Sequence, residues 1–260
     1  MRPRGALLLL ALVAGGCGTS DAGATRPLHN PGSGSPSGPD FSDASLWLSF
    51  DEETVSYEGS TEYPDALGGP FAGRVVTARA GAVESVQGAP GRGLAVAFPS
   101  RCTAPTGCPR AMVEVPADPA LDPGEAPFAY GASVLLRADQ TTVGSNVLQQ
   151  GRFGTTGGQW KLQVDGDAGL PSCVLRSGTD VLTVRSSVSV ADGEWHRIVC
   201  RRDPTGLSID VDASVDRVAG HTGSVSNTWP IRIGTPGVGD QDDQFHGRVD
   251  DVFLDIGPYA

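Results

Sequence analysis

The stretch DGEWHRIVCRRDPTGLSIDVD, residues 192–212, contains two short segments in which apolar and polar residues alternate. Ile198 and Cys200 fall on one side of the first segment, and Ile209 and Val211 fall on one side of the second. A period of two is typical of a β-strand with one buried face. The string DPTG between the segments consists of residue types that favour a tight turn. The stretch therefore predicts two consecutive strands joined by a turn.

The same pattern of short apolar segments and turn residues extends over residues 46–260, which we predict to be a single domain. Short apolar runs are bounded by Gly, Pro, Asp and Ser, and no long window has the i, i+3, i+4, i+7 spacing of an amphipathic helix. About a dozen short strands in roughly 215 residues predict an all-β fold, a two-sheet antiparallel jelly-roll sandwich. The predicted strands cover residues 46–50, 93–98, 112–115, 129–137, 146–152, 160–164, 173–177, 181–184, 196–201, 207–211, 230–233 and 247–255.

Several strings in this region resemble the laminin-G-like, concanavalin A-like lectin domains, in the family's order. They are LWLSFDE at 46–52, GLAVAF at 93–98, DGEWHRIV at 192–199, IRIG at 231–234 and FHGRVDDV at 245–252. The resemblance implies a jelly roll from a family dominated by recognition modules. It also implies that VDDV belongs to a closing strand.

The N-terminus has the features of an export signal. A basic start and a short apolar run precede small residues and then Cys17. The apolar run is shorter than the ~20 residues that span a bilayer. The pattern resembles the lipobox of bacterial lipoproteins, which implies cleavage of residues 1–16 and lipidation of Cys17. The alternative is an ordinary signal peptide with a chance cysteine. Residues 17–45, rich in Gly, Ser and Pro, are then predicted to be the lipidated cysteine and a disordered tether.

Cysteine usage agrees with export. The chain has five cysteines, and an exported protein with an odd number requires an explanation. If Cys17 carries lipid, Cys102 and Cys108 can pair across a short Pro/Gly loop, and Cys173 and Cys200 pair by elimination. Zinc binding is the alternative, but no C-x-x-C string occurs and no histidine lies near Cys102 or Cys108 in the sequence.

The charge balance excludes some partners. The formal net charge is −11, from 19 basic and 30 acidic residues. Removal of residues 1–16 takes away two arginines and no acid, which leaves 17 against 30, or −13. An acidic domain repels phosphate backbones and anionic headgroups, so we expect no nucleic-acid partner. Membrane attachment would then depend on the acyl chains at a bacterial cell membrane, either the outer membrane or the outer face of the plasma membrane.

An acidic loop is the one candidate metal site. Asp240, Asp242 and Asp243 lie close together among glycines, and flexible oxygen ligands suit Ca²⁺. The alternative is a solvated acidic turn. We expect calcium as a possible cofactor and no other.

Catalytic motifs are absent from the sequence. The chain has no G-x-S-x-G, P-loop, dinucleotide-binding or H-E-x-x-H string. The VDDV string lacks the glutamates and spacing of related glucanases. His196 shares a strand face with Ile198 and Cys200, which indicates a structural histidine. We therefore expect a non-enzymatic protein.

Ligand binding is expected to involve loops and exposed aromatic residues. We select Trp229, Tyr57 and Tyr63 as candidate ligand contacts, with the two tyrosines placed in a long loop after the first strand. The expected partner is a carbohydrate or an envelope or extracellular protein. The alternatives are a structural cell-envelope lipoprotein without a diffusible ligand and a glycoside hydrolase of concanavalin A-like fold. The sequence does not choose among these ligands and does not predict an oligomeric state.

Overall fold

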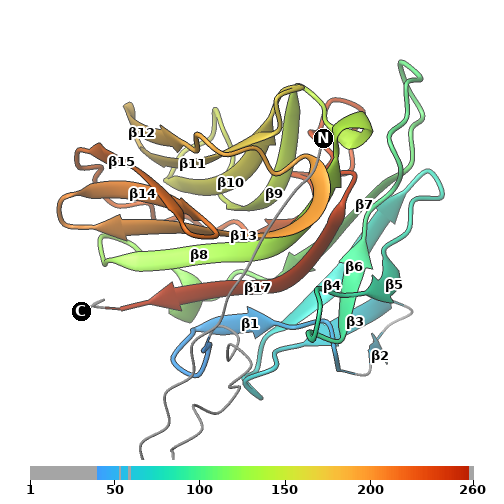
Figure 1. Cartoon of the computed structure of the whole chain (residues 1–260). Coiled ribbons are helices and arrows are strands. Elements are labelled where there is room, and N and C mark those ends of the chain that lie inside the picture. The colour runs from blue at the N-terminus through green and yellow to red at the C-terminus, as the bar shows by residue number, and fades with distance from the viewer. Residues whose placement is uncertain (1–39, 53, 58–59, 258–260) are drawn as a thin grey trace, which may run out of the picture. The chain divides into compact units, whose positions relative to one another are not determined.

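Two antiparallel sheets make up most of the chain that the computed structural model describes, namely residues 40–52, 54–57 and 60–257 (Figure 1). The eight-stranded sheet has the order β15-β14-β13-β8-β17-β6-β5, and β1 pairs with β17. The nine-stranded sheet has the order β12-β11-β10-β9-β16-β7-β4-β3-β2. The strands are β1 (Leu46–Leu48), β2 (Val55–Tyr57), β3 (Ser60–Pro64), β4 (Ala72–Ala78), β5 (Glu84–Gln87), β6 (Leu94–Ala97), β7 (Arg110–Val115), β8 (Phe128–Arg137), β9 (Gly144–Gln150), β10 (Gln159–Asp165), β11 (Leu170–Ser177), β12 (Asp180–Arg185), β13 (Asp192–Asp203), β14 (Gly206–Val211), β15 (Ser214–Ala219), β16 (Ile231–Ile233) and β17 (Arg248–Ile256).

The predicted all-β jelly-roll sandwich is confirmed. Every predicted strand corresponds to an observed one with ends shifted by a few residues, and two 3₁₀ turns, Pro119–Leu121 and Ala138–Gln140, complete the described elements. The prediction missed β2, β3, β4, β5 and β15. These strands lie at or near the edges of the sheets, where fewer positions need apolar side chains.

The alternation in residues 192–212 places its apolar residues in the core. Ile198 pairs with Val211 and Cys200 pairs with Ile209 between β13 and β14. All four residues are buried in the main hydrophobic cluster. One face of each sheet therefore packs against the other sheet, and the opposite faces remain outside.

Three aromatic residues connect the two sheets at the centre of the core. Tyr130 on β8 stacks with Phe128 and lies 4.7 Å from the ring of Trp160 on β10. The Tyr130 hydroxyl donates to the carbonyl oxygen of Lys161 at 3.1 Å, and Trp160 Nε1 donates to Gln150 Oε1 at 2.9 Å. Burial raises the pKa of Tyr130. These hydrogen bonds satisfy polar groups that would be costly to bury unpaired.

Two disulfides confirm the predicted pairing. Cys173 on β11 is bonded to Cys200 on β13, with Cα atoms 5.8 Å apart, so this bond links the two sheets. Cys102 and Cys108 close a short loop between β6 and β7. Cys17 lies outside the described residues.

The described domain begins several residues before the predicted boundary at residue 46. Phe41 is 5% exposed and covers the outward face of the eight-stranded sheet. Its ring lies 4.8 Å from Trp47 and 5.2 Å from Phe253, and the Arg197 guanidinium lies over it at 4.9 Å. The prediction failed here because a single phenylalanine in a polar segment gives no periodic signal.

No helix among the described residues is both long and apolar enough to cross a membrane.

Replacing both Cys173 and Cys200 with alanine should lower the free energy of unfolding by about 3.5 kcal/mol, because the bond restricts a long loop in the unfolded chain. The control is the Cys102→Ala, Cys108→Ala pair, whose shorter loop predicts a loss of about 2.5 kcal/mol. Equilibrium denaturant unfolding measures both. A larger loss for the control pair would contradict this loop-length argument.

Candidate ligand-binding face

Cross-strand pairing gathers polar side chains on the outward face of the nine-stranded sheet, which we call the polar face. The register places four polar residues, Glu114, Arg232, Gln149 and Lys161, in one row from β7 to β10, and Val174 on β11 ends the row. Since successive side chains of a strand point to opposite faces, this row faces outward. The flanking residues in these strands are buried in the core: Val113, Val115, Ile231, Ile233, Leu148, Trp160, Leu162, Cys173 and Leu175.

Arg232 holds Trp229 at one end of the row. Its Nε donates to Glu114 Oε2 at 2.8 Å, and its guanidinium lies 5.3 Å from the centre of the Trp229 ring. The Trp229 carbonyl oxygen accepts a hydrogen bond from Gln150 Nε2 at 3.1 Å. The partly buried Trp229 is thus held beside the polar face, in a position that a ligand could contact.

Phe153 is a second aromatic residue beside this face, and the sequence analysis missed it. It lies in the loop between β9 and β10 and is 82% exposed. The guanidinium of Arg176, on β11, lies 5.3 Å from the ring centre. The signal in the sequence was a lone phenylalanine in the glycine-rich string GRFGTTGG, residues 151–158, between two predicted strands.

Lys161 lies in the middle of the row and is partly buried. Burial lowers its pKa, and the nearby carboxylates of Asp243 and Asp165 oppose that shift. It is the single lysine of the chain. A partly buried cation at the centre of a sheet face can bind an anionic or strongly polar group of a ligand.

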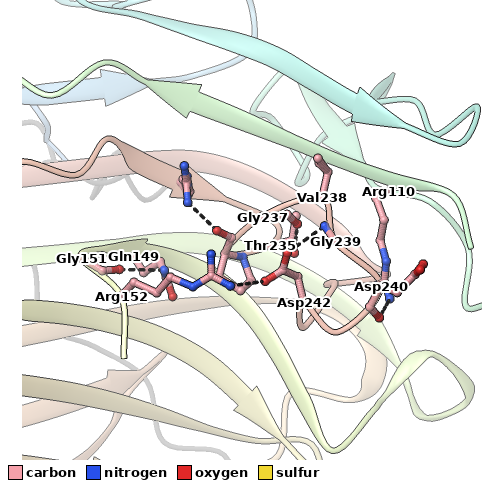
Figure 2. Close-up of polar contacts among 12 residues, drawn as sticks. Arg110, Gln149, Gly151, Arg152, Thr235, Gly237, Val238, Gly239, Asp240 and Asp242 are labelled. Carbon is pink, nitrogen blue, oxygen red and sulfur yellow. Dashed lines mark hydrogen bonds and ion pairs between the residues drawn. The ribbon is translucent and has the colours of Figure 1, made fainter. Parts of the chain in front are cut away.

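The acidic loop borders the polar face, and its carboxylates are bound by the protein itself. Asp242 Oδ1 lies 3.2 Å from Arg152 Nη2, and Asp242 Oδ2 accepts from the backbone of Gly239 (Figure 2). Asp240 Oδ1 lies 3.1 Å from Arg79 Nη2. Asp243 is exposed, but protein around its carboxyl partly desolvates it and raises its pKa, which Lys161 opposes.

These contacts do not fit the predicted calcium site. Asp240 and Asp242 are each neutralised by an arginine instead of converging with Asp243 on a shared ion. In the described part of the chain, no group of three or more His, Cys, Asp or Glu side chains is placed to hold a metal ion. Calcium binding by this loop therefore stays a prediction without support from the geometry.

The two tyrosines do not lie in a loop, as had been predicted. Tyr57 is in β2 and Tyr63 is in β3, which pair with each other. Tyr63 is 4% exposed and packs edge-on against Phe50 in the core. A ligand cannot stack on a buried ring, so the choice of Tyr63 as a contact was wrong. The reason is that the strand period of β3 turns this side chain inward.

The closing strand carries two buried carboxylates. Asp250 Oδ2 accepts from the backbone of Ala89 at 3.2 Å, and Asp251 Oδ1 accepts from Trp47 Nε1 at 3.0 Å. An irregularity in β17 follows Asp250, and Asp251 has a left-handed φ of 48°. Burial raises the pKa of Asp250 to about 7, and the neighbouring charge of Asp251 adds to this. Both residues are buried, so a polysaccharide cannot reach them.

His196 has the contacts of a structural residue. Its ring nitrogens lie 2.8 Å from Asp212 Oδ2 and 3.0 Å from Asp192 Oδ1. Burial lowers the pKa of His196, but the two carboxylates together outweigh burial and raise it. The imidazole thereby joins β13 to the β14–β15 turn.

A family model described as the concanavalin A-like lectin/glucanases superfamily matches residues 113–254, more than half of the chain. The chain belongs to this superfamily. The match runs from β7 to β17 and so includes the strands that contribute the row from Glu114 to Val174. No curated protein matches the chain.

Solved structures similar to this lectin/glucanase-type domain share its fold at low sequence identity. Domain 4 of AbnA, a GH43 extracellular arabinanase from Geobacillus stearothermophilus in complex with arabinotriose, has a TM-score of 0.59 and 14% identity, over 84% of this chain and 94% of that chain. A botulinum neurotoxin type C structure, concerning cell entry that depends on two ganglioside molecules, has a TM-score of 0.55 and 12% identity, over 83% and 48%. The binding domain of botulinum neurotoxin DC in complex with rat synaptotagmin II has a TM-score of 0.57 and 12% identity, over 84% and 49%. The match spans about half the length of these toxin chains.

Asp250→Asn should weaken the pH dependence of the domain's stability. The Asp250 carboxyl has a pKa of about 7 in the folded domain and an ordinary value of ~3.9 when unfolded. Folding therefore favours the protonated form, and this contribution to stability is fully present below about pH 4 and lost as the pH rises through about 7. The wild type should lose stability across this window more steeply than the variant.

Melting temperatures between pH 4 and pH 8 measure this difference. Asp167→Asn, at an exposed position, is the control and should follow the wild type. Parallel curves for wild type and Asp250→Asn would contradict the prediction.

Proposed function

We propose that the domain is a non-catalytic module that binds a glycan on the polar face. The observation that carries the proposal is the partly exposed polar side chains of Glu114, Arg232 and Lys161 in the row, with two ring–guanidinium pairs beside them, Trp229 with Arg232 and Phe153 with Arg176. Sugar rings present apolar faces and a polar rim, so they suit sites that combine aromatic surface with a few fixed polar groups.

The two aromatic residues belong to loops at the same end of the sheet. Gln150, the last residue of β9, pairs with Ile231 and with Trp160. Trp229 lies two residues before Ile231, and Phe153 lies three residues after Gln150. A hydrogen bond from the backbone of Gly158 to Ser226 also joins these two loops. One extended ligand could therefore contact Trp229, Phe153 and the outward side chains of the row that crosses these strands.

The comparisons support a binding module without naming its ligand. One structural neighbour is in complex with arabinotriose, and others concern gangliosides and synaptotagmin II. Because these structures are at most 14% identical to this chain, they share its fold alone, and the ligand has to be argued from the site.

Binding of an extracellular protein is the second candidate. One structural neighbour is a toxin binding domain in complex with rat synaptotagmin II, so a chain that contains this scaffold can bind a protein. Two experiments with a protein of residues 40–260 distinguish a glycan ligand from a protein ligand. They are a glycan array and a pull-down of envelope and extracellular proteins. The protein of residues 40–260 keeps Phe41 and the whole described core.

Phe153→Ala and Trp229→Ala should each weaken glycan binding about fivefold to tenfold. Stacking on a sugar removes roughly 50 Å² of ring surface from water, at ~25 cal/mol per Å². Isothermal titration against the best array hit measures the change. Val215→Ala, an exposed position on the other sheet, is the control and should bind like the wild type. Unchanged affinity in both aromatic variants would place the site elsewhere, and turnover of the glycan would overturn the non-catalytic proposal.

We also propose that Cys17 anchors the protein to a bacterial membrane through lipid. The support is the position of Cys17 after a short signal-like segment and the pairing of the other four cysteines in disulfides. A lipidated cysteine would account for the odd number.

Cys17→Ser should move the protein from the membrane fraction to the soluble fraction, because the thiol that accepts the lipid is lost. Cell fractionation with mass spectrometry of the N-terminus checks this. Membrane association that persists in a Cys17→Ser protein lacking residues 1–16 would contradict it.

A further inference from the structure

Most cations on or beside the polar face are already paired with a carboxylate. Such pairs satisfy the arginine without any ligand. The pairs are Arg74 with Glu62 (2.6 Å), Arg232 with Glu114 (2.8 Å), Arg152 with Asp242 (3.2 Å) and Arg185 with Asp165 (3.3 Å).

Three cations on the same face have no carboxylate within ion-pair distance among the described residues: Lys161, Arg176 and Arg110. Arg110 Nη2 donates to the backbone carbonyl oxygen of Asp240 at 2.9 Å, and β16 and β9 separate its strand, β7, from β10, so Lys161 and Arg176 are the neighbouring pair. Arg176 Nε donates to the carbonyl oxygen of Gly178 at 3.1 Å, while its Nη1 is buried without a hydrogen-bond partner. No described group forms a hydrogen bond with the Lys161 ammonium. An unpaired, partly buried donor costs free energy, which a ligand that brings an acceptor can recover.

The register places Lys161 and Arg176 close together. Lys161 pairs with Val174, and Arg176 lies two residues further along the same face of β11. Diagonal neighbours of this kind are ~7–8 Å apart in an antiparallel sheet. Long side chains can reach a common group across that distance. The exposed ring of Phe153 lies against Arg176, so an apolar surface adjoins the pair.

The two carboxylates that act on Lys161, those of Asp165 and Asp243, do not form an ion pair with it. Asp165 is engaged by Ser172 Oγ at 2.6 Å, by Gln163 Nε2 and by Arg185. The Asp243 carboxylate lies beyond ion-pair distance from Lys161, although its charge raises the pKa of Lys161. Burial raises the pKa of Asp243 itself.

We propose that the polar face prefers glycans that carry carboxylate or sulfate groups. Lys161 and Arg176 bind the anionic group, and Phe153 supports the adjacent sugar ring. This inference rests on the proposed glycan-binding function. It runs against the overall charge of −11, which disfavours acidic polymers, so a preference for them has to come from a local site.

The experiment compares matched pairs of polymers that differ in charge. Polygalacturonate with its fully methyl-esterified form tests carboxylates, and dextran sulfate with dextran tests sulfates. Binding of residues 40–260 is measured by titration at 50 mM and 500 mM NaCl. We expect at least a tenfold preference for the charged member of one pair at low salt, decreasing at high salt. The pair that shows the preference identifies the anionic group.

Variants test whether the preference comes from Lys161 and Arg176. Lys161→Gln and Arg176→Gln should each reduce it to threefold or less, and Lys161→Arg should retain it. Arg185→Gln removes a paired cation from the same sheet face and should leave the preference unchanged. Melting temperatures show that each variant is folded, and Lys161→Arg controls for any effect of Lys161→Gln on the fold.

The outcomes separate this inference from the function on which it rests. Equal binding of charged and neutral polymers, or an equal effect of Arg185→Gln and Lys161→Gln, overturns the preference for acidic glycans. If neutral glycans still bind and Phe153→Ala weakens that binding, the proposed glycan-binding function is supported and only the preference for acidic glycans is wrong. If no glycan binds at all, both proposals fail.

Discussion

The contact between Tyr130 and Trp160 joins the two sheets at the centre of the core, and the rest of the molecule is arranged around it. The rings lie 4.7 Å apart, and the Tyr130 hydroxyl is bonded to the backbone of Lys161. Because successive residues of β10 point to opposite faces, burial of Trp160 turns Lys161 outward. The disulfide between Cys173 and Cys200 links the same two sheets nearby in the fold. The core therefore determines which side chains reach the polar face.

The polar face is a product of strand order more than of any one segment. Glu114, Gln149, Lys161 and Arg232 lie far apart in the sequence and become neighbours through pairing of β7, β16, β9 and β10. The acidic loop borders this face, and its charge is balanced locally by Arg79 and Arg152. Lys161 and Arg176 remain on this face as neighbouring cations without a carboxylate within ion-pair distance. The electrostatic character of the face thus differs from that of the chain as a whole.

Membership of the concanavalin A-like lectin/glucanases superfamily explains the scaffold and leaves the chemistry to particular residues. The same scaffold occurs in structures with an arabinose trisaccharide and in toxin domains studied with gangliosides or synaptotagmin II. The particular residues on the polar face of this chain are the two rings against arginines and the single lysine, Lys161, on β10. The buried carboxylates of β17 lie on the other sheet and contribute to the pH dependence of the fold, away from the polar face.

The sequence by itself determined the fold class, the central strands and both disulfides. Period-two alternation and turn residues are local signals, and residues 192–212 already contained them. Tertiary structure alone decided that Tyr63 is buried, that Phe41 belongs to the domain, that the acidic loop is held by arginines, and that Phe153 lies beside Arg176. The physical reason is that alternation tells which side of a strand a residue takes, whereas the pairing register and loop contacts depend on residues distant in the chain. A site assembled across several strands therefore cannot be recognised in the sequence until the pairing of those strands is known.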